Sequence, residues 1–138
     1  MITMPLCRAV LSASTAVILS AGAAAATPAQ TVPKHLNLSN KDNRQSFTVH
    51  KGDEIIVRLT GQQTVTSTWA WSAPTAANRS VLRRDAATTR PNGEATAVFH
   101  AQADGTTTLD SRLRCVPRRP GSACSHVVVP WQVTVKAR

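Results

Sequence analysis

Apolar and polar residues alternate with a period of two along much of this chain, and the pattern is clearest near its end. In the segment 109–115 the odd positions are mostly apolar and the even ones are charged: Leu109, Leu113 and Cys115 against Asp110, Arg112 and Arg114. The alternation returns over 127–135, after a Pro- and Gly-rich connection at 116–123. A period of two gives a strand one buried and one solvent-exposed face. The two segments therefore predict a long antiparallel hairpin.

Shorter alternating segments precede this hairpin and predict further strands. They are a weak edge strand at 36–38, strands at 47–49 and 55–59 joined tightly by Lys51-Gly52-Asp53, a strand ending in Trp69-Ala70-Trp71, a short strand at Val81-Leu82 and a strand at 95–101. Residues 73–79 are predicted to be a connection because they contain Pro74 and Asn78, and residues 85–93 because they are mainly polar and end in Pro91-Asn92-Gly93.

These strands, about seven to eight in number with turn signals roughly every ten residues, predict an all-β fold. The pattern favours an immunoglobulin-like antiparallel β-sandwich, and a small closed barrel is the structural alternative. The aromatic residues expected to anchor the core are Trp71, Phe99 and Trp131.

The first 26 residues have the features of a secretory signal peptide. Arg8 precedes an uncharged run that ends in Ala24-Ala25-Ala26. A membrane anchor would need about 18 to 20 strongly apolar residues, whereas this run is diluted by Ser, Thr and Gly. We therefore predict a secreted, extracellular protein without a transmembrane anchor in its mature form: a signal peptide at 1–26, a linker at 27–34 and one domain at 35–138.

Cleavage would remove Cys7 and leave two cysteines, Cys115 and Cys124, at the feet of the hairpin loop. An even number of cysteines in an oxidising compartment favours a disulfide. Closing a loop of about ten residues contributes roughly 2.5 to 3 kcal/mol in the chain-entropy model. We expect the bridge to supply much of a small domain's stability.

The mature chain is basic. Without Arg8 it has fifteen Lys and Arg residues against seven acidic ones, a formal charge of about +8. This balance favours an anionic polymer or an acidic protein as partner without selecting between them. Nucleic-acid binding also uses exposed aromatic residues for stacking. The chain has three Trp and two Phe, most of them needed for the core, so we expect no specific nucleic-acid partner.

Catalytic and metal-binding patterns are sparse. The chain lacks a G-x-S-x-G elbow, an H-E-x-x-H pair and a phosphate-binding glycine loop. Cys124 and His126 could pair a thiol with a base, but no further partner accompanies them. A zinc site from Cys115, Cys124 and His126 would lack a fourth ligand. We therefore expect no enzyme, no cofactor and no metal.

Several features occur in a recognisable order between Phe47 and Val135. They are Lys51-Gly52-Asp53 before an alternating strand, the aromatic-x-Trp segment Trp69-Ala70-Trp71, the run A-Q-A-D-G-T-T-T-L at 101–109, and a last strand W-Q-V-T-V at 131–135. This order resembles the chagasin-type inhibitors of papain-like cysteine peptidases. Members of that family are immunoglobulin-like sandwiches that lay three loops from one end along the peptidase's active-site cleft.

The resemblance implies which residues here would form the inhibitory loops. They are Thr64, Val65, Thr66, Ser67, Thr68 and Trp69 in the first loop, Asn92 and Gly93 in the second, and Arg118, Arg119 and Pro120 in the third. The family's first-loop motif N-P-T-T-G-Y/F-x-W is matched at Thr66, Trp69 and Trp71. Its Asn, Pro and Gly are Thr64, Val65 and Thr68 here.

The chain departs from the family's pattern at two further points. A β-branched residue at Thr68 is expected to resist the backbone conformation and close approach that the family's Gly permits. The family's third loop carries Arg-Pro-Trp, whereas Arg119-Pro120-Gly121 lacks the Trp and a disulfide is added.

Two functions follow from these observations. The first is a non-enzymatic inhibitor of a papain-like cysteine peptidase, acting through loops at 64–69, 91–94 and 116–123. The alternative is an extracellular or cell-envelope protein that binds an anionic polymer or a protein partner. The first requires the three loops to converge on one end of the sandwich.

Overall fold

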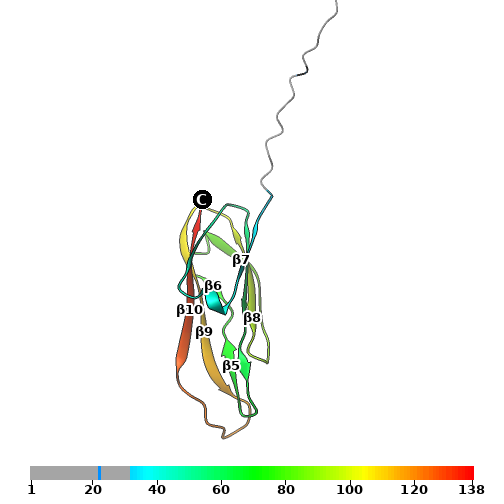
Figure 1. Cartoon of the computed structure of the whole chain (residues 1–138), viewed down its shortest axis with the longest axis vertical. Helices are drawn as coiled ribbons and strands as arrows, with labels where there is room; N and C mark the ends of the chain where they lie inside the picture. The colour runs from blue at the N-terminus through cyan, green and yellow to red at the C-terminus, as the bar shows by residue number, and fades with distance from the viewer. Residues whose placement is uncertain (1–21, 23–31) are drawn as a thin grey trace, which may run out of the picture. The chain divides into compact units, whose positions relative to one another are not determined.

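Ten strands and one short 3₁₀ turn form the regular structure of the part of the chain that the computed structural model describes, residue 22 and residues 32–138 (Figure 1). The elements are β1 (His35–Leu38), η1 (Asn40–Asp42), β2 (Ser46–Val49), β3 (Glu54–Leu59), β4 (Gln62–Gln63), β5 (Ser67–Trp71), β6 (Thr75–Ala76), β7 (Leu82–Thr89), β8 (Ala95–Ala101), β9 (Gly105–Pro117) and β10 (Val128–Ala137). The predicted signal peptide and most of the predicted linker lie outside the described residues. No helix within 32–138 has the length and hydropathy needed to cross a membrane.

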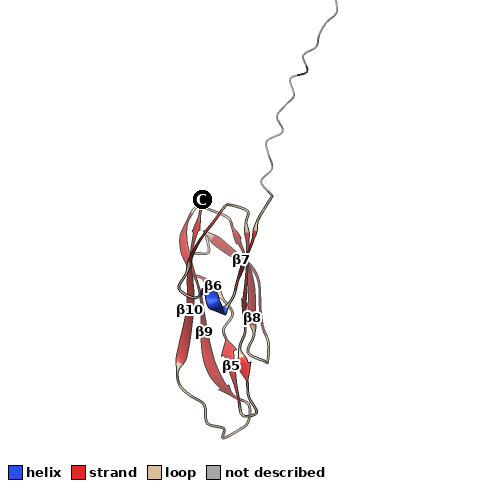
Figure 2. Cartoon of the chain, viewed as in Figure 1, coloured by secondary structure: helices blue, strands red, loops and turns tan. Residues whose placement is uncertain are grey.

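The strands form two sheets, as Figure 2 shows. The four-stranded sheet has the order β1-β3-β8-β7, and the six-stranded sheet has the order β2-β10-β9-β5-β4, with β6 also pairing with β9. β9 and β10 pair antiparallel from Gly105 opposite Ala137 to Arg114 opposite Val128. The predicted all-β sandwich and its long terminal hairpin are therefore confirmed.

The N-terminal strands divide between the sheets. β1 pairs parallel with β3, and β2 pairs parallel with β10. The turn at Lys51-Gly52-Asp53 therefore carries the chain from one sheet to the other, and the two strands predicted to be joined tightly do not pair with each other. Gly52 has a φ of 88° in this turn, a left-handed conformation that glycine adopts without steric cost.

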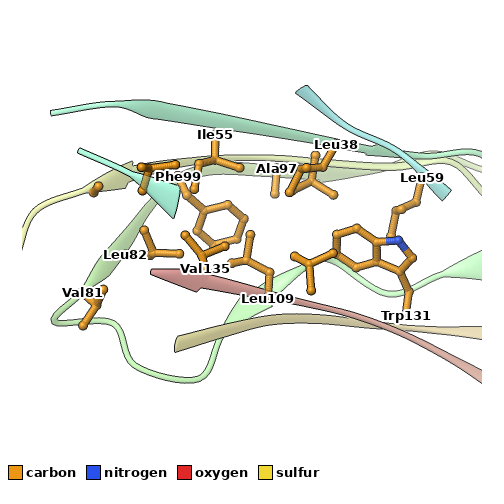
Figure 3. Close-up of a cluster of buried hydrophobic side chains, with 14 of the residues drawn as sticks. Leu38, Ile55, Leu59, Val81, Leu82, Ala97, Phe99, Leu109, Trp131 and Val135 are labelled. Atoms are coloured by element: carbon orange, nitrogen blue, oxygen red, sulfur yellow. The ribbon is translucent and has the colours of Figure 1, made fainter. Parts of the chain in front are cut away.

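The core lies between the sheets and follows the alternation in the sequence (Figure 3). Its largest fully buried side chains include Trp131 from β10, Phe99 from β8 and Ile55 from β3. Trp71 is 6% exposed and donates its indole N–H to the Thr60 carbonyl. The indole N–H of Trp131 donates to the Ser39 carbonyl, so both indoles satisfy their polar group while buried.

Three details of the predicted strands are wrong. Residues Thr75 and Ala76, inside the predicted connection 73–79, form β6, which pairs with β9. Residues 85–89, predicted as part of a polar connection, belong to β7, which pairs with β8 and has a bulge between Arg84 and Ala86. β7 is an edge strand and is exposed at every position after Leu82, so it shows no apolar alternation. In the predicted strand 127–135, Val127 precedes β10, and Val129 is exposed although Trp131 is buried.

Candidate functional site

The three predicted loops lie in the segments that connect β4 to β5, β7 to β8, and β9 to β10. In Figure 1 the β9–β10 connection and the β5 end of the six-stranded sheet lie together at the bottom of the view. Hydrogen bonds and close backbone contacts join these segments. Together they place the three loops at one end of the sandwich, hereafter the loop end.

The first loop is a tight turn at 64–67. The Thr64 N–H donates to the Ser67 carbonyl at 2.8 Å, and the Thr64 hydroxyl accepts from the Ser67 N–H at 3.1 Å. Short polar side chains stabilise turns through such local bonds. Val65, at the tip, is 68% exposed. Thr64 thus closes the turn with its own side chain and leaves an apolar residue free at the tip.

Thr68 lies in β5 and is only 5% exposed. Its backbone is not left-handed, because Arg44 is the one non-glycine residue with a positive φ among residues 32–138. The conformational objection to threonine at this position therefore does not apply in this structure. Two glycines elsewhere, Gly61 and Gly93, approach the β5 backbone closely.

Gly61 and Gly93 both contact the β5 backbone. A Cβ atom on either residue would overlap the carbonyl oxygen of Trp69, and one on Gly61 would also overlap the Gly93 carbonyl. Gly93 has a φ of 92° and accepts a hydrogen bond from the Trp71 N–H at 3.0 Å. The second loop is therefore packed, backbone to backbone, against the strand that follows the first.

A side-chain contact reinforces this junction. The Gln63 amide donates to the Pro91 carbonyl at 3.4 Å, and to the Thr68 hydroxyl at 3.4 Å. The sequence identified the second loop, 91–94 with Asn92 and Gly93, but not the supporting residues Gly61 and Gln63. The available signal was a glycine two residues after the end of β3, at a position where another backbone can approach closely.

The third loop is attached to the first through Arg118. Its N–H donates to the Thr66 carbonyl at 2.9 Å, and its guanidinium donates to the Thr64 carbonyl at 2.6 Å. Arg119 and Pro120 are exposed beyond this contact. Arg118 therefore holds the two loops together, and its neighbours remain available to a partner.

A disulfide joins Cys115, in β9, to Cys124, in the β9–β10 connection, with 5.7 Å between their Cα atoms. The predicted bridge is confirmed. Because both sulfurs are in the disulfide, neither is a thiol that could act as nucleophile or zinc ligand. Among the described residues no three His, Cys, Asp or Glu side chains are grouped so as to hold a metal ion.

Apolar side chains are exposed around the loops. Within residues 32–138 the large apolar residues with high exposure are Val32, Val65, Val116, Val127, Val128 and Val129. All but the first belong to the first loop or to the β9–β10 hairpin. Next to them is an open groove of about 540 Å³, bordered by Trp69, Leu113 and Val129. The loop end therefore offers apolar contact area on a fixed backbone.

No protein-family model and no curated protein sequence matches this chain. Solved structures do. The crystal structure of the cysteine protease inhibitor EhICP2 from Entamoeba histolytica is similar with a TM-score of 0.52 and 14% identity, over 76% of this chain and 96% of that one. The structure of PbICP-C in complex with falcipain-2 has a TM-score of 0.46 and 12% identity, over 76% of this chain and 99% of that one.

The solution structure of amebosin has a TM-score of 0.39 and 15% identity, over 78% of this chain and 100% of that one. The similarity to EhICP2 is one of fold. It confirms, at that level, the resemblance to inhibitors of cysteine peptidases that the order of sequence elements predicts.

Proposed function

We propose that this protein is a non-enzymatic inhibitor of papain-like cysteine peptidases and that the loop end is its contact surface. The observation that carries the proposal is the direct attachment of the first loop to the other two: Arg118 binds the carbonyls of Thr64 and Thr66, and Gly93 packs on Trp69. The fold shared with the inhibitor EhICP2 supports it.

Inhibition through this surface would depend on shape and rigidity. Binding costs free energy for every side chain and loop that must be ordered, and a loop that is already ordered lowers this cost. Here the turn at 64–67, the bonds of Arg118 and the Cys115–Cys124 disulfide order the loops in the free protein. The first loop would then place Val65 in the cleft, and the other two would contact its sides.

We also propose that this protein is exported from the cytoplasm. Cys115–Cys124 is a disulfide between two cysteines of a small domain, which is typical of proteins that fold outside the cytosol. Residues 1–26 have the pattern of a signal peptide. The target peptidase would accordingly be met outside the cytoplasm of the producing cell.

The experiment is a measurement of inhibition constants against several papain-like peptidases, with Val65→Asp as the test variant. A charge at an apolar tip is expected to weaken inhibition at least tenfold if Val65 enters the cleft, because the carboxylate would lose its hydration. Val32→Asp is the matched control: Val32 is 78% exposed and lies outside the loop end.

We expect the wild type to inhibit reversibly. Val32→Asp should retain this inhibition, and Val65→Asp should lose it. Absence of inhibition at micromolar concentration across the peptidases would refute the proposed function. Equal inhibition by both variants would leave an inhibitor whose contact surface lies elsewhere.

A further inference from the structure

Charged residues are arranged differently on the two faces of the sandwich. Every ion pair found among residues 32–138 lies on the four-stranded sheet or on a turn that borders it: His35–Glu54, His50–Asp53, Arg58–Glu94, Arg83–Asp85, His100–Glu54 and His100–Asp85. On that face, each carboxylate of these pairs lies next to an arginine or a histidine.

The outer face of the six-stranded sheet is basic and unpaired. Arg112 and Arg114 in β9, Lys136 in β10, and Arg44 in the turn before β2 are exposed, and none of them forms an ion pair within the described chain. Asp110 is the acidic residue on this face. Its carboxylate accepts hydrogen bonds from the Gln132 amide at 2.6 Å and the Thr108 hydroxyl at 2.9 Å.

A groove of about 670 Å³ crosses this face. The turn at 43–44 borders it on one side and the segment 72–75 on the other, with β9 and β10 between them. Its exposed polar side chains are those of Arg44, Arg112, Gln132, Ser72 and Thr75, and the half-buried Asp110 lies among them. Two cations therefore share a groove with groups that bind hydroxyls.

Arg44 is held in this groove in an unusual backbone conformation. Its φ is 66°, which costs free energy for a side-chain-bearing residue. The Arg44 N–H donates to the Gln132 carbonyl at 2.7 Å, and the neighbouring Asn43 side chain accepts from the Gln132 N–H at 2.9 Å. Strained residues of this kind occur more often at binding sites than elsewhere. Asparagine or glycine would fit the same turn with less strain.

We propose that this groove binds an acidic polysaccharide, with Arg44 and Arg112 contacting its carboxylate or sulfate groups and Gln132, Thr75 and Asp110 contacting its hydroxyls. Guanidinium groups bind carboxylate and sulfate oxygens through paired N–H donors. The Asp110 carboxylate is a hydrogen-bond acceptor and can accept from a sugar hydroxyl. Trp131 borders this groove but is only 1% exposed, and Phe47 in β2 is packed against the core. Trp69 lies at the loop end, so the groove has no exposed aromatic ring on which nucleic-acid bases could stack.

The groove and the loop end use different residues. The proposed saccharide site therefore does not depend on peptidase inhibition. An inhibitor bound to an acidic matrix through one face would keep its loops free for a peptidase.

The test is binding of a fluorescein-labelled oligogalacturonate to the full-length mature chain, measured by fluorescence anisotropy at low and moderate salt. Arg44→Asn combined with Arg112→Gln is expected to weaken binding at least tenfold, because each change removes a charged hydrogen-bond donor. Arg58→Gln is the matched control: it removes one positive charge from the opposite face, where Arg58 pairs with Glu94. It is expected to change affinity less than about twofold.

The melting temperature shows whether each variant is folded. Arg44→Asn should not lower the melting temperature, because asparagine relieves the backbone strain at this position. Arg112→Gln alone, at an exposed strand position, repeats the test without altering the turn. The proposal would be overturned if the oligogalacturonate did not bind at low salt, or if Arg58→Gln lost as much affinity for it as the double variant does. It would also be overturned if neutral dextran oligosaccharides bound equally tightly, or if single-stranded DNA or phosphatidylglycerol vesicles bound more tightly.

Discussion

The two ends of the sandwich are held together by different kinds of contact. At the loop end, Gly61 and Gly93 bring backbones together at Trp69, and apolar side chains remain exposed. At the opposite end the buried Asp53 carboxylate accepts hydrogen bonds from the backbone N–H groups of Lys34 and His50, at 3.1 and 2.8 Å. The backbone of the loop end is therefore fixed without using most of its side chains, which leaves them available to a partner.

Replacing a glycine with alanine should reveal the largest difference in stability between the two ends. Gly93→Ala is expected to destabilise the protein by about 3 kcal/mol or more, because alanine resists the positive φ and its Cβ would overlap the Trp69 carbonyl. Chemical denaturation measures the free energy of unfolding. Gly52→Ala is the control at the other end: its φ is 88°, but nothing lies within 4 Å of the added Cβ.

The control should cost only about 1 kcal/mol, from backbone strain alone. The difference between the two substitutions measures the close approach at the loop end. Equal losses would mean that the backbone contact at Trp69 relaxes easily, and that the second loop is not fixed against the first.

Removing the disulfide should have the next largest effect. Cys115→Ser with Cys124→Ser is expected to lower the free energy of unfolding by about 2.5 to 3 kcal/mol, mainly by freeing the unfolded chain. The bonds from Arg118 to the first loop do not involve the bridge and should preserve the fold. Inhibition measured well below the melting temperature then reports on loop order alone.

If inhibition weakens in the double variant while its fold persists, the bridge orders a contact surface. Full inhibition under those conditions would assign the bridge to stability only. An unchanged free energy of unfolding would contradict the chain-entropy account of this disulfide.

The sequence predicts the fold well wherever a strand has one buried and one exposed face. Residues 55–59 and 95–101 alternate visibly, and both lie in the core. The edge strand β7 was missed beyond Leu82 because neither of its faces is buried there. A period-2 signal reports burial, so a strand that is exposed on both faces gives no such signal.

The candidate site was only partly predictable for a different reason. The resemblance identified loops at 64–69 and 92–93, but it could not show that Gly61 supports them, because Gly61 meets Trp69 of β5 and Gly93 of the β7–β8 connection only in the folded protein. The local sequence around Arg44 likewise gives no indication of its left-handed backbone. Contacts of this kind depend on how the sheets are stacked, which no local pattern specifies.

Asp53 provides the smallest test, and it concerns the end opposite the loops. Burial raises the pKa of its carboxyl, but the two backbone N–H donors and the nearby His50 and Lys34 charges outweigh this, so the pKa lies below its ordinary value of 3.8. A carboxyl with a lowered pKa stabilises the fold above the unfolded-state pKa. That contribution is lost as the pH falls through the lower, folded-state value.

Asp53→Asn is therefore expected to cost about 1 to 2 kcal/mol near neutral pH, because the amide replaces one of two acceptors of buried backbone bonds with a donor. The gap between wild type and variant should begin to narrow near pH 3.8, where Asp53 of the unfolded chain takes up its proton, and should close as the pH falls through the lower pKa of the folded protein. Unfolding free energies at several pH values check this, with the exposed Asp104→Asn as control. A gap that stays constant down to strongly acidic pH would show that packing of the turn, and not the carboxylate charge, holds this end together.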